Sequence, residues 1–367
     1  MRNRINRREF LKATAVAGGL LLIPPQVASG LMPADQFDAF PDAKFLGRNC
    51  LGGIMNFRVR PSADAEINKS VYEDYVFPVY RQVVGETPAG TYSSTWFETP
   101  YGYVYAPGVQ LVKNEPNPNP PMTLPDNSVG KGFWAKVNVP YAGIVFGKSP
   151  LSPWYQSIEH FSPKVYYDQY FWIDEIKQGS NDITYYRANE LYGTYGDIVY
   201  VDARAFKPLT EEDVAPISPE VENKRIYADL TYQTITCYEN DVEVFFCRTS
   251  SGAVFNNDGT KVDSYATPTG NHYPWRKTIS IHMSGSLTGS GWDTPGVPWN
   301  IIFASGGASI HGVFWHNDFG TPRSHGCLNC RPEDAQWIWR WVNPQAGLDP
   351  GDVQVSGQVG TLIEVKN

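Results

Sequence analysis

Residues 225–249, "RIYADLTYQTITCYENDVEVFFCRT", carry the strongest fold signal in the C-terminal part of the chain. Aromatic and β-branched residues alternate with polar ones over two runs, and the Asn-Asp pair at 240–241 between them suits a two-residue hairpin loop. Runs rich in Val, Ile and Thr recur along the chain, whereas long stretches with a helical period of 3.6 residues are scarce. The sequence therefore predicts a mostly β protein.

The chain contains five cysteines in 367 residues, an odd number that is too small for a disulfide framework in a protein of this length. In the predicted hairpin, a two-residue loop places Cys237 opposite Val244 and Cys247 opposite Thr234. Because the two cysteines then do not face each other, we expect no bridge between them. We assign them to the strands as small apolar residues.

Proline-rich segments divide the chain into several parts. Residues 115–127, "EPNPNPPMTLPDN", are too rich in proline for a central strand, and a second loop with three prolines spans 208–219. We expect one small β module at 40–125, a second at 126–216 and a C-terminal domain at 224–367. The segments "YGYVYAPGVQLV" and "GDIVYVDARAFKPL", near the ends of the two modules, look alike and suggest a repeated unit.

The N-terminus has the pattern of an export signal. Positive charges precede an apolar run at 13–23 that is too short for a typical spanning helix, and small residues follow at 27–29. The pair Arg7-Arg8, followed by "EFLK", is similar to the twin-arginine consensus of signals that export folded proteins. We expect residues 1–29 to direct the protein out of the cytoplasm to the cell envelope, with retention as a membrane anchor as the alternative.

Composition and charge limit the classes of partner. A hydrophobic share of 42% with 14% aromatic residues is typical of an ordered globular protein. The net charge is −8, and five of the 30 basic residues lie in the predicted export signal. No basic patch is left for a nucleic acid, so we exclude nucleic-acid binding.

The residues that can carry chemistry gather near the end of a long glycine-rich region. Loops of this length inside an ordered domain are usually functional. Three interpretations fit the residue types: a zinc site, a redox-active dithiol, or a cysteine nucleophile with a histidine partner. The candidates are His311, His316, His325, Cys327 and Cys330.

The first two interpretations fit the spacing poorly. A zinc site would combine two of the histidines with Cys327 and Cys330, a tetrahedral set that zinc accepts. The chain between the candidate ligand pairs does not match the usual distance in zinc modules. A redox pair would use the same two cysteines, but such a motif normally lies at the strand-to-helix junction of a βαβ unit. We expect neither site, and neither a metal nor another cofactor.

A cysteine nucleophile fits best. A neutral thiol attacks poorly and needs a base or a positive charge nearby, and His311 can supply either. Gly326 permits close approach of a substrate, and the N–H groups of Gly326 and Cys327 can point at a developing oxyanion. A helix predicted from Pro332 onward adds a dipole that favours the thiolate.

The "IHG" at 310–312, followed by "SHGCLN" at 324–329, resembles the signature of the L,D-transpeptidase (YkuD-type) catalytic domain. The similarity extends from about Lys224 to Lys366, and the upstream modules resemble bacterial SH3-type domains. The resemblance implies a β-sandwich or barrel with one short helix after the catalytic loop. It also implies an exported enzyme that cross-links peptidoglycan stem peptides through a Cys327 thioester and that reacts with carbapenems.

The resemblance assigns roles to single residues. Cys327 is the nucleophile, and His311 is the general base and acid. His325 orients the thiol loop, while Ser324 and Asn329 hold that loop by hydrogen bonds. Contacts with substrate are expected for Gly312, His316, Met283 and Trp299.

Neighbouring residues are expected to be structural. Cys330 lies outside the shared motif and takes no part in the chemistry. His282 is assigned to hydrogen bonding within the fold rather than to the substrate groove. Trp292 and Trp315 can shape the groove, although aromatic residues at this density more often belong to a core.

Two other functions stay open. The domain can act as an L,D-carboxypeptidase, in which water rather than an amine resolves the thioester, and the mass of the product separates the two. It can also be a wall-binding protein with an inactive site, although every expected catalytic position is filled. Acylation of Cys327 by a carbapenem would argue against an inactive site.

Overall fold

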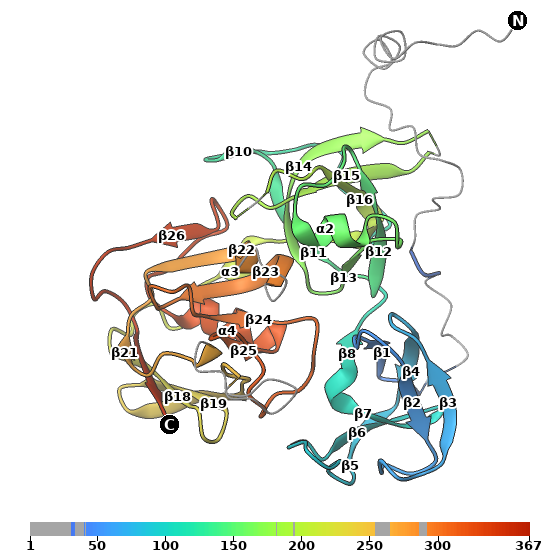
Figure 1. Cartoon of the computed structure of the whole chain (residues 1–367). Helices are drawn as coiled ribbons and strands as arrows, with labels where there is room; N and C mark the ends of the chain where they lie inside the picture. The colour runs from blue at the N-terminus through green and yellow to red at the C-terminus, as the bar shows by residue number, and fades with distance from the viewer. Residues whose placement is uncertain are drawn as a thin grey trace, which may run out of the picture.

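The computed structural model describes residues 31–33, 40, 42–180, 182–193, 195–253, 265–285 and 292–367. Strands dominate this part of the chain, which confirms the predicted mostly β fold. Figure 1 shows three β-rich parts that follow one another along the chain, here called the N-terminal module, the middle module and the sandwich. The predicted export signal lies outside the described residues. Within the described ranges, no helix is long and apolar enough to cross a membrane.

The N-terminal module consists of eight short strands. These are β1 (Phe45–Asn49), β2 (Met55–Arg58), β3 (Ile67–Val71), β4 (Val76–Val79), β5 (Arg81–Val84), β6 (Thr95–Thr99), β7 (Gly102–Tyr105) and β8 (Val109–Val112). They form two sheets, in the orders β4-β1-β8 and β3-β2-β7-β6-β5. Both sheets contribute to one core, in which the rings of Phe57 and Phe77 meet edge to face at 4.9 Å.

The middle module is built on one seven-stranded sheet in the order β13-β12-β16-β15-β14-β11-β17. Its strands are β11 (Phe133–Val137), β12 (Tyr141–Phe146), β13 (Lys164–Tyr166), β14 (Tyr170–Gln178), β15 (Thr184–Asn189), β16 (Val199–Asp202) and β17 (Phe206–Pro208). A two-stranded ribbon, β9 (Asp126–Asn127) and β10 (Gly130–Lys131), precedes them, and helix α2 (Pro153–Ile158) follows β12. The module has a hydrophobic core of its own.

The two modules end in the same local structure. In the first, the 3₁₀ turn η1 (Ala106–Gly108) joins β7 to β8, and in the second η2 (Ala203–Ala205) joins β16 to β17. Each turn closes with a backbone hydrogen bond to its first residue, from Val109 and from Phe206. The two segments that look alike in the sequence thus form the same strand–turn–strand unit. The resemblance of the modules to SH3-type domains stays a prediction.

The sandwich begins after the short helix α3 (Glu211–Val214) and has two five-stranded sheets. One sheet contains β18 (Lys224–Asp229), β19 (Thr234–Glu239), β20 (Val242–Arg248), β21 (Gly270–His272) and β27 (Leu362–Lys366). The other contains β22 (Arg276–Gly285), β23 (Trp292–Ile302), β24 (Ser309–Gly312), β25 (Leu328–Cys330) and β26 (Asp352–Gln354). The sheet orders are β20-β19-β18-β27-β21 and β25-β24-β23-β22-β26.

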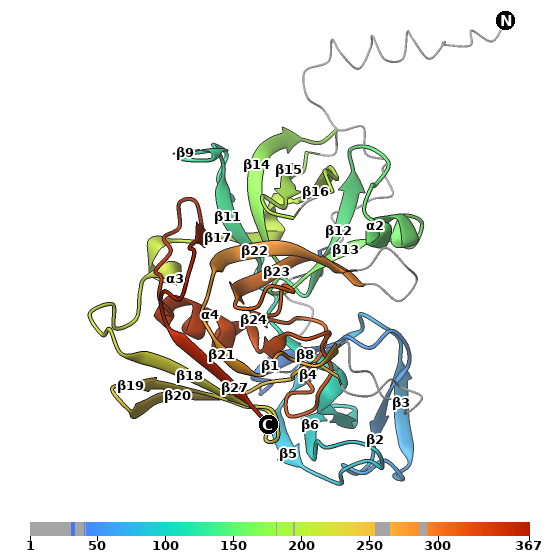
Figure 2. The same cartoon turned by 60° about the vertical axis from the view of Figure 1, so that its left-hand side comes forward.

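Helix α4 (Pro332–Trp341) lies between the two sheets of the sandwich (Figure 2). Trp337 stacks on Phe245 of β20 with a centroid distance of 4.1 Å. Trp339 packs against Trp299 of β23 at 5.2 Å. The helix begins with a proline and carries acidic residues in its first turn. It confirms the short helix expected after the catalytic loop.

The predicted hairpin is present, but its register differs by one residue. Residues 240 and 241 form the loop with φ angles of 47° and 67°, as a type I′ turn requires. A bulge leaves Val244 unpaired, so Cys237 lies opposite Phe245 rather than opposite Val244. Cys247 is shifted in the same way, and the two cysteines do not pair with each other. The alternating pattern of the sequence contains no signal for a single inserted residue.

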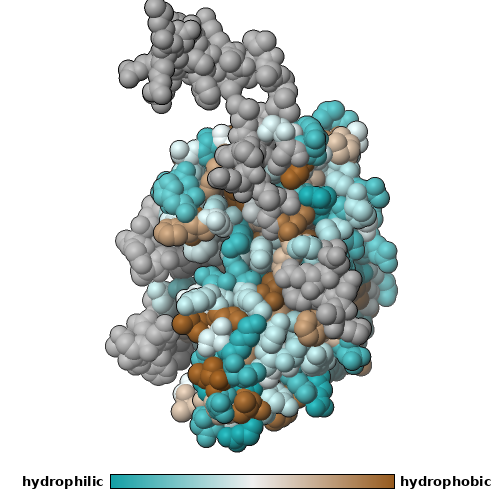
Figure 3. Space-filling model, turned by 90° about the vertical axis from the view of Figure 1, so that its right-hand side faces the viewer, coloured by the Kyte–Doolittle hydropathy of each residue, from teal (hydrophilic) through white to brown (hydrophobic). Residues whose placement is uncertain are grey.

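The three parts contact one another directly. Asn317 N in the sandwich donates to Pro107 O in the N-terminal module at 2.9 Å. Ser280 Oγ donates to Tyr170 O in the middle module at 2.7 Å. Hydrophilic residues cover most of the face shown in Figure 3, and hydrophobic residues form separate patches on it.

Candidate active site

A thiol and an imidazole line one cavity in the sandwich. The cavity has a volume of about 370 Å³, and Cys327 and His311 both face it. Strands β24 and β25 run parallel, with His311 opposite Asn329, two residues after Cys327. Because the two strands are neighbours, segments sixteen residues apart in the sequence meet at one point.

The His311 ring is held in one orientation. The side chain is 1% exposed, and Nδ1 lies 3.0 Å from the carbonyl oxygen of Gly312. Because a carbonyl oxygen only accepts, Nδ1 carries the proton of the neutral ring. The other nitrogen, Nε2, is therefore the atom that can take a proton from a thiol.

The surroundings of Cys327 favour the thiolate. Burial alone would raise the pKa of the thiol, but His311, once Nε2 has taken up the proton, stabilises the thiolate by a hydrogen bond and by its charge, and these outweigh burial. Ser309, whose Oγ lies 3.5 Å from Sγ, adds to this effect, and the net result is a pKa below the ordinary value. Sequence reasoning missed Ser309. It lies two residues before His311 on the same strand, a spacing that places both side chains on one face.

Ser324 closes the loop around Cys327. Its Oγ donates to the carbonyl oxygen of Cys327 at 2.6 Å and accepts from the N–H of Gly326 at 3.0 Å. Gly326 has a φ of 117°, which side-chain-bearing residues rarely adopt. Its N–H is thus already bonded, in contrast to the expectation that it is available to an oxyanion. No hydrogen bond joins the Cys327 N–H to another described residue, and its expected role as an oxyanion donor stays a prediction.

Asn329 holds the segment after the nucleophile. Its main chain exchanges two hydrogen bonds with Ser250, at 2.9 and 3.0 Å. Its side-chain Nδ2 lies 3.2 Å from Nε2 of His316.

The structure places His316 away from the Cys327 cavity. It is buried and lines a different cavity, between the sandwich and the two modules. Burial, followed by the charges of Arg323 and His311, lowers its pKa to about 3. This placement corrects the expectation that His316 contacts substrate beside the thiol.

His325 lines the same cavity as Cys327, and the residue is partly exposed. The edge of Tyr265 meets this ring at a centroid distance of 4.3 Å. Partial burial lowers the pKa of His325. The role of His325 in orienting the thiol loop stays a prediction.

The remaining predicted substrate contacts differ in their positions. Met283 lines the Cys327 cavity. Trp299 is fully buried in the core between Tyr170 and Trp339, which corrects the expectation that it reaches substrate. Gly312 is buried as well, and its main chain serves to orient His311. The side chain of Trp292 lies outside the described part of the structure.

The two cysteines of the "CLNC" motif occupy different environments. Cys330 is completely buried in the core that also contains Cys247, with Sγ 3.9 Å from Thr249 Oγ1. Cys327 faces the cavity. All five cysteines are free thiols. In the described ranges, no three His, Cys, Asp or Glu side chains are grouped so that they could hold a metal ion.

His282 is hydrogen-bonded inside the fold, as expected, but with partners that the sequence did not indicate. Its two ring nitrogens contact the carboxylates of Glu190, from the middle module, and Asp293, from β23. Burial opposes the charged ring, but the two carboxylates outweigh it and raise the pKa of His282 to about 9. Asp293 also accepts a hydrogen bond from the N–H of Trp154 in α2 at 2.7 Å. We call Glu190, His282 and Asp293 the histidine clamp.

Several L,D-transpeptidases are among the solved structures to which the chain shows similarity. A mutant L,D-transpeptidase from Enterococcus faecium is 21% identical over 40% of this chain and 51% of its own, with a TM-score of 0.29. The present chain thus spans about half of that protein. An L,D-transpeptidase from Mycobacterium smegmatis is 14% identical over 68% of this chain and 96% of its own, with a TM-score of 0.30. LdtMt1, solved with imipenem, is 15% identical over 68% and 99%, also with a TM-score of 0.30.

The comparison with sequence-family models assigns a defined range of the chain to one family. No curated protein matches the chain. Residues 223–365, however, match the family model of the YkuD domain, described as the L,D-transpeptidase catalytic domain. This range contains the sandwich together with the Cys327 cavity. Residues 223–365 therefore form a domain of the YkuD family, the L,D-transpeptidase catalytic domain.

Proposed function

We propose that the protein is a peptidoglycan L,D-transpeptidase that works through a thioester on Cys327. One observation carries the proposal: within the YkuD domain, a thiol of lowered pKa and an oriented imidazole share one cavity. Perturbed pKa values combined with a cavity and a base are the usual features of a catalytic nucleophile.

In the first half-reaction, the Cys327 thiolate attacks the carbonyl carbon of the third residue of a donor stem tetrapeptide. A C–S bond forms, and the C–N bond to the terminal D-alanine breaks. His311 Nε2 takes the thiol proton and gives it to the departing amine. The N–H of Cys327 is the donor for the oxyanion that develops on the carbonyl oxygen.

In the second half-reaction, an amine from a neighbouring stem attacks the thioester. His311 removes a proton from this amine, the new amide bond forms, and the thiol is released. The energy of the first amide bond is conserved in the thioester, so the reaction needs no ATP. This suits an enzyme that acts outside the cytoplasm.

Acylation of the intact protein by imipenem tests the nucleophile. Mass spectrometry of the full chain should show a single adduct, which maps to Cys327 and is absent from Cys327→Ala. Cys330→Ala is the matched control and should label like the wild type, because Cys330 is completely buried. Equal loss in both variants, or an adduct on another residue, would refute the assignment.

The same assay with peptides separates transfer from hydrolysis. Incubation with a donor tetrapeptide and an acceptor stem should give the cross-linked product and free D-alanine. If only the shortened tripeptide appears, the domain is an L,D-carboxypeptidase.

We also propose that residues 1–29 export the protein to the cell envelope by the twin-arginine route. The paired arginines, the short apolar run and the small residues after it support this. Cell fractionation of the wild type and of an R7K/R8K variant tests the proposal. An unchanged distribution of the variant would contradict it.

A further inference from the structure

A second cavity lies beside the Cys327 cavity, where the three parts of the chain meet, and has a volume of about 340 Å³. We call it the junction pocket. Its lining includes Arg48 and Glu73 from the N-terminal module, Trp154, Lys164 and Tyr166 from the middle module, and Phe314 from the sandwich. Thr294 and Trp315 line both cavities. A single ligand can therefore extend from one cavity into the other.

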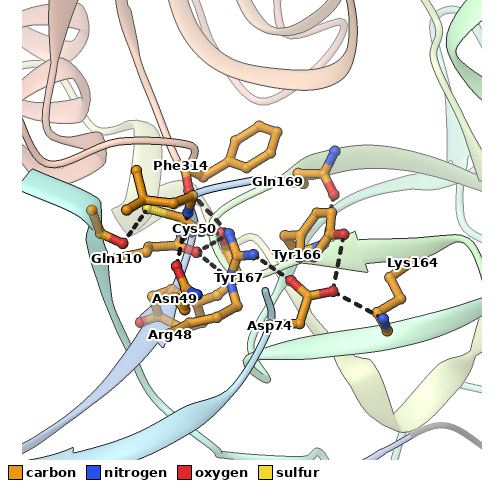
Figure 4. A network of polar contacts seen from close by, with 12 residues as sticks. Arg48, Asn49, Cys50, Asp74, Gln110, Lys164, Tyr166, Tyr167, Gln169 and Phe314 are labelled. Atoms are coloured by element: carbon orange, nitrogen blue, oxygen red, sulfur yellow. Dashed lines mark hydrogen bonds and ion pairs between the residues drawn. The ribbon is translucent and has the colours of Figure 1, made fainter. Parts of the chain in front are cut away.

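One side of the junction pocket is a network of paired charges, shown in Figure 4. Arg48 is 3% exposed and donates to Asp74 at 2.7 Å and to the carbonyl oxygen of Phe314 at 3.2 Å. Lys164 donates to the other carboxylate oxygen of Asp74 at 2.9 Å. These bonds join all three parts and fix the chain next to Trp315. The pocket is thus formed before any ligand arrives.

Two kinds of group remain available to a ligand. Trp154 has 40% of its surface exposed, so its indole is open to a ligand, whereas Phe314 is buried and the ring of Tyr166 faces the guanidinium of Arg48 at 4.2 Å. The carboxylate of Glu73 makes no hydrogen bond or ion pair with any described residue. Burial and the charge of Asp74 raise its pKa.

An aromatic surface beside a free carboxylate fits a ligand with both an apolar face and hydroxyl groups. The flat face of a sugar ring can stack on an indole, and its hydroxyl groups can bond to charged side chains at the edge. Lys164 has three N–H donors, of which Asp74 takes one. The pocket thus offers a strong acceptor and a strong donor around an aromatic surface.

We propose that the junction pocket binds a sugar residue of the glycan strand that carries the donor stem peptide. The proposal rests on the proposed function, because the stem that reaches Cys327 is joined at its other end to glycan. Thr294 and Trp315 line both cavities, so they lie where the stem peptide of the bound donor would join its sugar. The upstream modules then contribute directly to substrate selection.

The test compares two donors with the full chain: a free tetrapeptide, and the same tetrapeptide attached to its disaccharide. The wild type should show a KM roughly tenfold lower for the disaccharide donor. Trp154→Ala should reduce this ratio of the two KM values roughly fivefold, because the stacking surface is lost. The KM for the free tetrapeptide and the rate of imipenem acylation should not change.

Phe161→Ala is the matched control. Phe161 is an aromatic residue of the same module, 78% exposed and outside the pocket lining, and its loss should leave the preference intact. Glu73→Gln is a second test variant, which removes the free charge without shortening the side chain. It should also reduce the preference.

Two outcomes would overturn the pocket assignment while leaving the proposed function in place. In the first, the wild type turns over both donors with the same KM. In the second, Trp154→Ala and Glu73→Gln both keep the full preference. If neither donor nor imipenem reacts at Cys327, the proposed function fails and the assignment of the pocket fails with it.

Discussion

At the scale of single residues, the reactivity of Cys327 depends on a balance between burial and polar contacts. Burial would keep the thiol protonated, while His311 and Ser309 stabilise the thiolate. His311 acts through both its charge and a hydrogen bond, and Ser309 through hydrogen bonds. A change at Ser309 therefore alters the acidity of the thiol without removing the base.

Ser309→Ala should shift the pH profile of Cys327 alkylation to higher pH, because the lost hydrogen bond raises the pKa of the thiol. At pH 7 the rate with iodoacetamide should fall roughly two- to fivefold. The measurement is the alkylation rate from pH 5 to 9, followed by intact mass. Ser284→Ala is the control, since Ser284 lines the same cavity but makes no contact with the thiol. A profile of Ser309→Ala identical to the wild type would refute this role.

The sequence predicted single residues well where a short motif contains them. His311 and Cys327 both lie in such a motif, and the structure brings them together. The Gly326 N–H donates to the hydroxyl of Ser324, and this bond depends on the rotamer of Ser324. The spacing of residues in the sequence does not predict a rotamer. Residue type alone does not show that His316 and Trp299 lie outside the Cys327 cavity. Both are buried, and their burial depends on how the surrounding sheets pack.

At the scale of elements, the catalytic loop depends on a close approach of two backbone segments. Gly252 forms a bridge with Ser324, and its N–H donates to Thr267 Oγ1 at 2.8 Å. A Cβ atom at Gly252 would lie 1.8 Å from the carbonyl oxygen of Tyr265. Any side chain there must push apart the segments that contact the thiol loop.

Gly252→Ala should therefore slow imipenem acylation of Cys327 roughly tenfold or more, because the loop is displaced. The overpacking should also lower the free energy of unfolding by about 1–3 kcal/mol. The acylation rate and the thermal unfolding midpoint measure the two effects. Gly306→Ala should change neither, since Gly306 lines the cavity but has no atom within 4 Å of its Cβ position. Acylation of Gly252→Ala at the wild-type rate would disprove the argument.

Strong local signals predicted elements correctly. The pair at 240–241 gave the hairpin loop, and Pro332 with two acidic residues gave the start of α4. The bulge at Val244 was missed because one inserted residue leaves the hydrophobic pattern almost unchanged. Helix α2 was missed because six residues are too few to show a helical period.

At the scale of the whole molecule, the histidine clamp joins the middle module to the active-site domain. Glu190 and His282 are 92 residues apart in the sequence, and both are buried. His282 and Asp293 lie on β22 and β23, the strands whose ends carry Met283 and Thr294 into the Cys327 cavity. Such pairs depend on how separate modules dock, so local sequence patterns do not predict them.

The clamp should make stability depend on pH. The folded pKa of His282, about 9, lies above its ordinary value of 6.5, so folding favours the protonated ring. Its contribution, on the order of 3 kcal/mol, is complete below about pH 6.5 and is lost as the pH rises through about 9.

Chemical denaturation between pH 6 and 10 measures this contribution. The wild type should lose stability over that range relative to His282→Gln, in which the ring is absent. His160→Gln changes an exposed histidine and should follow the wild type. Parallel curves for the wild type and His282→Gln would show that the clamp does not titrate as described.

The position of β27 has a consequence for biosynthesis. This strand inserts between β18 and β21 and pairs in parallel with β18, whose residues are synthesised more than 130 positions earlier. Until the ribosome has passed residue 366, β18 has a partner on only one side and the active-site domain stays incomplete. The N-terminal and middle modules close their own sheets well before that point, so the domain that contains Cys327 is the last part of the described chain to be completed.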